Sequence, residues 1–230
     1  MYKVRIIQLA SIFGLALFIV SVCAFVSEAD AINDSVVVDG VTYSLKESGE
    51  GDYAIVTAVN SDLTEVSIPS SITDSGKSFE VRSIDANAFQ DSSSDDKKNR
   101  NLLNLTIQAN NNFRLEPNQF SSCVSLTTVV LGTGITEISD NAFVGCTNLE
   151  EVTLPSTIVS IGNSSFSGCT KLTTINQVNG LKIIGESAFK NCSGLTGFNF
   201  GSNLETISTD AFRGCTGLIE IELPNSVVTL

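Results

Sequence analysis

The 230-residue sequence contains no histidine and no tryptophan. Without histidine the chain has no Ser-His-Asp triad, no Cys-His catalytic pair and no histidine-ligated zinc site. This absence removes the commonest catalytic and metal-binding constellations, and leaves carboxylate-pair chemistry of the glycosidase kind. Because no recognisable catalytic motif accompanies the carboxylates, we expect a protein without enzymatic activity, cofactor or metal.

Basic residues are scarce: 13 lysines and arginines stand against 25 aspartates and glutamates, a net charge of −12. A chain of this charge repels phosphate backbones, which argues against nucleic acid as a partner. The same acidity is an ordinary property of soluble exported proteins, whose net charge keeps the molecules apart.

Long hydrophobic runs are confined to the N-terminus, where a largely apolar, uncharged segment extends from Ile6 to Val26. It follows two basic residues and precedes small residues that suit cleavage after Ala31, an order typical of a secretory signal peptide over residues 1–31. Two alternatives remain open: an uncleaved membrane anchor, because the run is longer than usual, and lipid attachment at Cys23. We expect a secreted or cell-surface protein, with any membrane contact confined to this segment.

Cysteine recurs every 23 residues, with phenylalanine three places before each one and leucine three places after it. A register held over four intervals indicates one structural unit copied along an axis, and a period in the twenties is typical of a solenoid. The cysteines are Cys123, Cys146, Cys169, Cys192 and Cys215; the phenylalanines are Phe120, Phe143, Phe166, Phe189 and Phe212; the leucines are Leu126, Leu149, Leu172, Leu195 and Leu218.

The repeats begin at Leu63, but the first step, to Leu102, is 39 residues and exceeds the period by 16. We assign the excess to two insertions near 73–81 and 91–100, which should bulge from the coil as surface loops. Residues 32–62 do not fit the register; they contain two short strands around an Asp-Gly turn and a third strand, and we assign them to an N-terminal β cap. About six and a half repeats then occupy 63–230.

Each unit carries a Leu-x-x-Val-x-Leu pattern, as at 149–154, which is typical of a short strand with alternate residues buried. An Ile-x-x-Ile pair, as at 158–161, forms the next side of the coil. The segment before each phenylalanine begins with helix-capping residues such as Ser139-Asp140-Asn141, and predicts one short helical turn. The fold expected is a β-rich solenoid of 23-residue repeats with stacked parallel strands about 4.8 Å apart.

The pattern at 149–169 resembles the BspA-like leucine-rich repeats, also called the Treponema pallidum type, and 184–192 is similar to the helical segment of that family. The resemblance runs from about residue 36 to the end, with Gln177 where a strand would place an apolar residue. It implies a leucine-rich-repeat solenoid that is exported or held at the cell surface and binds other proteins. Members are often linked to adhesion to host matrix, other microbes or innate immune receptors, and few if any are thought to be enzymes. The resemblance does not identify a ligand.

The outward positions of the strands form a row of threonine, asparagine and carboxylate side chains that suits an extended partner surface. The alternative is an ordinary solvated sheet face. If the row binds a partner, the expected function is adhesion to host or microbial surface or matrix proteins; a spacer module of a longer surface protein is the first alternative and a hydrolase the second. The candidate binding face comprises Thr128, Val130, Glu151, Thr153, Thr174, Asn176, Asn199 and Glu222.

The cysteine column invites a disulfide interpretation, because stacked coils place equivalent Cα atoms within disulfide reach. Equivalent side chains in a stack point the same way, however, and each cysteine accompanies a core phenylalanine. We therefore expect buried, reduced thiols beside a continuous aromatic spine.

Two further segments are less regular. The 91–100 loop is rich in oxygen ligands but lacks the spacing of a calcium-binding EF-hand, so we expect a solvated loop. Residues 227–230 stop inside a repeat without a polar cap, from which we expect a fragment of a longer array, with pairing between copies as the alternative. The oligomeric state stays open.

Overall fold

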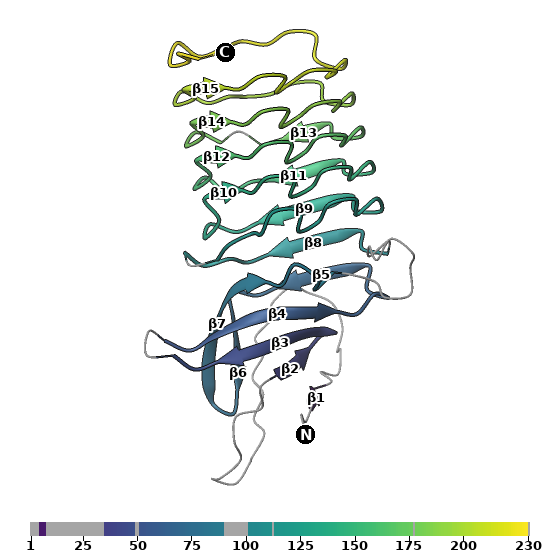
Figure 1. Ribbon diagram of the computed structural model, residues 1–230, viewed down its shortest axis with the longest axis vertical. Coiled ribbons are helices and arrows are strands. Elements are labelled where there is room, and N and C mark those ends of the chain that lie inside the picture. Colours follow the sequence, from purple (N-terminus) through teal and green to yellow (C-terminus); the bar gives the residue numbers. More distant parts are fainter. Residues whose placement is uncertain are drawn as a thin grey trace, which may run out of the picture.

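The computed structural model describes residues 5–7, 35–48, 51–89, 101–111, 113–176 and 178–229, and these residues form fifteen strands and no helix. Figure 1 shows the coils stacked along the long axis of the molecule, which is the solenoid that the 23-residue period predicts. Apart from Arg5–Ile7 (β1), the predicted signal peptide lies outside the described residues. The described part of the chain contains no helix long and apolar enough to cross a membrane.

A six-stranded mixed sheet forms the N-terminal end of the stack. β2 and β3 form the hairpin expected from the sequence, and Asp39 and Gly40 at its turn both have positive φ, as a two-residue turn favours. In spatial order the strands are β1, β2 (Ser35–Val38), β3 (Val41–Lys46), β4 (Tyr53–Val59), β7 (Lys77–Ile84) and β6 (Ser71–Asp74).

The segment near 73–81, expected as a surface loop, contributes to a β-hairpin of this sheet. β6 and β7 pair antiparallel, and β7 also pairs in parallel with β4. The alternation of buried Phe79 and Val81 with more exposed neighbours explains why the segment is extended and joins a sheet. The second insertion, 91–100, lies outside the described residues.

The Leu-x-x-Val-x-Leu segments build one side of the solenoid as a parallel sheet. Residues at equivalent repeat positions are paired, for example Val129 with Val152 and Val152 with Ile175, and these side chains are buried. The outward surface of this sheet is called the strand face below. Its strands are, in order, β5 (Glu65–Ile68), β8 (Asn104–Ile107), β9 (Thr128–Leu131), β11 (Glu151–Thr153) and β13 (Thr174–Ile175).

A second parallel sheet, not predicted from the sequence, forms the side of the coils that carries the Ile-x-x-Ile pairs. Its inward positions are Ile138, Ile161, Ile184 and Ile207, a column of β-branched residues that favours extended backbone. The strands are β10 (Glu137–Ile138), β12 (Ser160–Ile161), β14 (Ile183–Ile184) and β15 (Thr206–Ile207).

The third side carries the phenylalanines, and the short helical turns predicted there are not helices. Asn141 and Gly145 have φ of 56° and 73°, the left-handed region that interrupts a right-handed helix. The amides of Asn141, Phe143 and Gly145 donate to carbonyls of the next coil, whereas the amides between them donate to carbonyls three residues earlier in the same coil. Because alternate amides bond between coils, the segment is a pair of turns that stacks like a strand.

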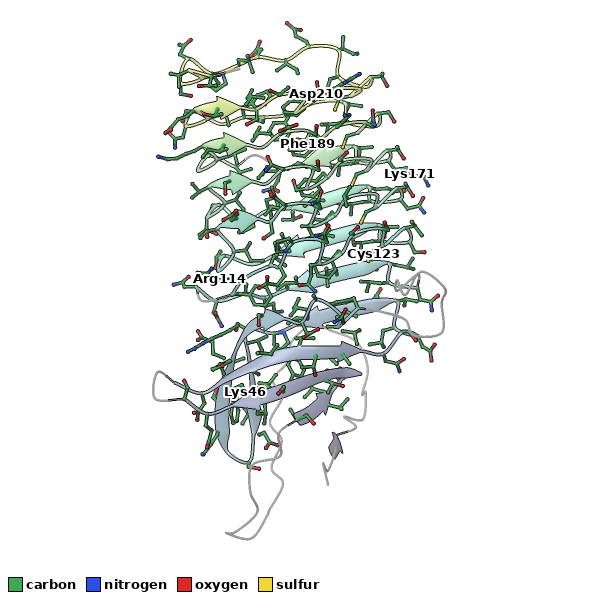
Figure 2. The ribbon with its side chains drawn as sticks, viewed as in Figure 1. Lys46, Arg114, Cys123, Lys171, Phe189 and Asp210 are labelled. Carbon is green, nitrogen blue, oxygen red and sulfur yellow. The ribbon has the colours of Figure 1, made fainter. Side chains whose placement is uncertain are left out.

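The phenylalanine column is a continuous ring stack. Phe120, Phe143, Phe166 and Phe189 are fully buried, and each adjacent pair of rings is nearly parallel with centroids 5.3 Å apart. Figure 2 shows Phe189 inside the stack. The aromatic spine expected from the sequence is therefore confirmed.

The cysteines are thiols, as expected, and no disulfide joins the five that the structure describes. The Sγ of Cys169 donates to the carbonyl oxygen of Phe143 at 3.2 Å, and Cys146, Cys192 and Cys215 repeat this bond to the phenylalanine 26 residues earlier. This bond orients these four thiols in one direction along the stack. Burial raises the pKa of Cys169 from its ordinary value of 9.0 to about 12.

The raised pKa of Cys169 predicts a loss of stability in alkali. Above pH 9 the thiol ionises in the unfolded chain but stays protonated in the folded one, so folding stability is full below pH 9 and falls as the pH rises toward 12. At pH 10 this thiol should lower the free energy of unfolding by about 1.4 kcal/mol. Urea denaturation at pH 8 and pH 10 measures the drop, which should be smaller by that amount in Cys169→Ala; an unchanged drop would contradict the assignment.

Candidate binding face

The candidate residues form two outward rows across the strand face. Thr128 of β9, Glu151 of β11 and Thr174 of β13 are in register in the first row, and Val130 and Thr153 are paired in the second. The alternation of the strands sends these side chains outward while Val129, Val152 and Ile175 are buried. The structure therefore brings together the five candidates that lie on strands.

All eight candidates are half-buried or exposed, so none is part of the core. Val130 is 42% exposed, an apolar side chain on an otherwise polar face. Glu151, Thr153 and Thr174 make no side-chain hydrogen bond to any other residue that the structure describes. The hydrogen-bonding groups of these three side chains are therefore available at the surface.

Three other candidates use their side chains within the chain. Asn176 bridges to the coil below: its Nδ2 donates to the carbonyl of Leu154 at 2.8 Å, and its Oδ1 accepts from the Leu154 amide at 2.6 Å. Thr128 donates to Asn104 Oδ1 at 2.5 Å, and Asn199 Oδ1 accepts from the Gly201 amide at 3.1 Å. Asn176 and Thr128 thus hold neighbouring coils in register, whereas the bond of Asn199 stabilises a turn within its own coil.

Asn199 and Glu222 lie beyond the last strand of this sheet, β13. They line a groove of about 700 Å³ together with Thr174, and Phe198 and Phe200 lie along it. Sequence reasoning missed these two phenylalanines as parts of the face. The repeat pattern offers no signal for them, because Phe198 stands where the preceding coils place the inward residues Val129, Val152 and Ile175.

The side chains of this face are hydroxyl, carboxylate and apolar groups. The described residues contain no group of three or more cysteine, aspartate or glutamate side chains that could hold a metal ion. The calcium-like 91–100 loop lies outside the described residues. A flat row of hydroxyl, carboxylate and apolar side chains offers contacts spread over several coils.

Comparison with known proteins identifies this architecture. A family model described as the BspA type leucine rich repeat region matches residues 113–230 in 6 copies, just over half of the chain. None of the curated proteins compared matches the sequence.

Solved structures with the same fold come from bacteria. A leucine-rich repeat protein from Bacteroides ovatus is 22% identical with a TM-score of 0.56 over 83% of this chain and 54% of its own. The leucine rich repeat protein of T. pallidum is 22% identical, with a TM-score of 0.53 over 82% of this chain and 78% of its own. A leucine rich cell surface protein of Faecalibacterium prausnitzii is 21% identical, with a TM-score of 0.54 over 85% of this chain and 55% of its own. This chain thus spans about half the length of the first and third proteins, and these likenesses show the fold.

Proposed function

Because the chain belongs to the BspA type leucine-rich repeat family, we propose that it is a secreted or cell-surface protein that binds other proteins, in adhesion to host or microbial surface or matrix proteins. The observation that carries the proposal is the strand face, a row of outward side chains in register on β8, β9, β11 and β13. Solenoids commonly use such extended surfaces for binding. The cell-surface description of the Faecalibacterium prausnitzii protein, which shares the fold, supports the location.

The proposed mechanism is contact at many points. Val130 offers apolar area, Thr153 and Thr174 offer hydroxyl groups, and Glu151 offers a carboxylate, and together these residues come from three successive strands of the stack. Because no single one of them is a large buried anchor, the loss of one should weaken binding only modestly.

The test is saturable binding of the purified protein to immobilised matrix and plasma proteins across a salt series. The variant Val130→Lys/Thr153→Lys/Thr174→Lys should bind at least about tenfold more weakly, because it places three bulky cations on the strand face. The matched control, Ser160→Lys/Ile183→Lys/Thr206→Lys, makes the same change of charge on three residues in register on the second sheet.

The control variant should bind like the unmodified protein. Equal losses in both variants would mean that net charge, not the strand face, governs binding. An absence of binding by the folded, unmodified protein to every protein on the panel would contradict adhesion and favour a spacer role.

A further inference from the structure

The strand face is interrupted after β13. The amides of Thr127, Glu150 and Thr173 each donate to a carbonyl of the preceding coil, at 2.8, 2.9 and 3.1 Å. In the following coil no strand forms over residues 195–200, and the amides of 196–200 donate to no backbone carbonyl among the described residues. The backbone of this coil is therefore separated from the edge of β13.

The cause lies in the side chain at position 198. Phe198 replaces the valine or isoleucine of the coils below, and its ring lies edge-on to Phe189 and Phe212, with centroids 5.2 and 5.3 Å away. A ring occupies more volume than a β-branched side chain, and a packed core accepts extra volume only if the backbone moves. Phe198 thus holds its segment away from the sheet, and its own side chain is half-buried.

The separation produces the groove. β13 forms one wall, residues 220–224 form the other, and residues 196–201 lie along it. Ile175, Phe198 and Leu223 give it an apolar lining, while Glu220 and Glu222 are exposed carboxylates. None of the described residues that line it is a lysine or arginine.

We propose that this groove binds an extended, basic peptide segment of a partner protein by strand addition. An unpaired strand edge is a template for another extended chain, whose backbone would bond to β13 and to the unpaired amides of 196–200. Alternate side chains of that segment would face the apolar lining, and lysine or arginine side chains would meet Glu220 and Glu222. The inference rests on the proposed function, since the partner is a protein, and it locates one contact of that partner.

The probe is a fluorescein-labelled octapeptide of four Lys-Val repeats, titrated against the full chain and followed by fluorescence polarisation. Its counterpart of four Glu-Val repeats should bind at least tenfold more weakly. In Phe198→Val, which restores the residue type of the coils below, the segment should pair with β13 and close the groove. We expect at least tenfold weaker binding of the Lys-Val peptide and slower hydrogen exchange of the 196–200 amides.

A second pair of variants separates specific contacts from general attraction to an acidic protein. Glu220→Gln/Glu222→Gln should weaken binding of the Lys-Val peptide about tenfold. Glu137→Gln/Glu186→Gln, which removes two exposed carboxylates outside the groove, should change it less than twofold. Equal effects of the two pairs, or unchanged binding by Phe198→Val, would overturn the groove assignment.

The outcomes also distinguish this inference from the function on which it rests. Suppose that the protein binds matrix proteins, that the triple variant at Val130, Thr153 and Thr174 abolishes this binding, and that the octapeptide does not bind. This result would overturn the groove assignment and leave the adhesion proposal standing. Specific binding of the octapeptide without binding of any matrix protein would support the groove and contradict adhesion.

Discussion

Replacing Phe166 with alanine is expected to lower the free energy of unfolding by about 3–5 kcal/mol. The Phe166 ring is fully buried between those of Phe143 and Phe189, with centroids 5.3 Å away on both sides and interplanar angles of 7° and 4°. Alanine would leave a cavity between two rings that the stacked coils hold in place. Native domains are stable by only about 5–15 kcal/mol, so this one change removes a large share of the total.

Urea denaturation followed by circular dichroism measures the loss, and Phe212→Ala is the matched control. Phe212 stacks on Phe189 with ring centroids 5.3 Å apart but is half-buried, so its replacement by alanine removes less buried apolar area than the replacement of Phe166. We expect the control to lose about half as much stability. A loss below about 1 kcal/mol at Phe166, or equal losses at both positions, would contradict the view that burial of the ring between its neighbours sets the size of the loss.

The core of this protein could be predicted from the sequence because the same apolar residue types recur at the same positions of every 23-residue unit. Phe166, Cys169 and Leu172 occupy fixed positions in the 23-residue unit, and burial of such a column is the only way for one coil to cover the apolar side of the next. The Leu-x-x-Val-x-Leu pattern likewise places Val152 inward and Thr153 outward. Alternation along a short strand thus predicts which side chains of each strand point outward.

The short helical turns before the phenylalanines were predicted wrongly because the helix propensity of a segment takes no account of hydrogen bonds to the neighbouring coil. Ser139-Asp140-Asn141 suits a helix N-terminus, where a capping side chain would accept a hydrogen bond from one of the first amides of the helix. In the stack, the Asn141 amide donates instead to the carbonyl of Asn163 in the next coil, at 2.9 Å. Bonds between coils therefore decide the conformation, and residues that tolerate positive φ, such as Asn141 and Gly145, permit it.

The groove could not be predicted from the repeat alone because it arises where one coil departs from the pattern. Replacement of a valine or isoleucine by Phe198 keeps the position apolar, so the binary pattern is intact. Strand pairing, however, depends on the volume of the side chain at this position. Beside Phe189 and Phe212 a valine or isoleucine is compatible with a paired strand, whereas the larger ring of Phe198 is not. A repeat pattern predicts which positions are inward, but not which coils can pair.

Replacing Gly134 with alanine should lower the free energy of unfolding by about 2–3 kcal/mol. A Cβ atom at Gly134 would lie 1.7 Å from the carbonyl oxygen of Asn110 and 2.0 Å from its carbonyl carbon, so the backbone of one coil must move. Asn110 resists that movement because its Nδ2 donates to the carbonyls of Ser70 and Val81, at 3.0 and 3.2 Å. The clash therefore separates the regular repeats from the coil beneath them.

Gly180→Ala is the matched control for this prediction, because Gly180 holds the same repeat position two coils along. Its Cβ atom would meet the carbonyl oxygens of Ser156 and Ile158 at 3.0 and 3.1 Å, contacts that small shifts relieve. The intervening coil carries Thr157 there, with its hydroxyl bonded to the carbonyl of Ile135 at 2.8 Å, so the position accepts a side chain where the coils stack regularly. Alanine also restricts the unfolded chain, which stabilises by about 0.4–1 kcal/mol, so the control should be nearly neutral. Similar urea midpoints for the two variants would mean that the 102–125 coil shifts and relieves the clash. A lower midpoint for Gly134→Ala alone would show that the 102–125 coil stacks as rigidly as the regular repeats.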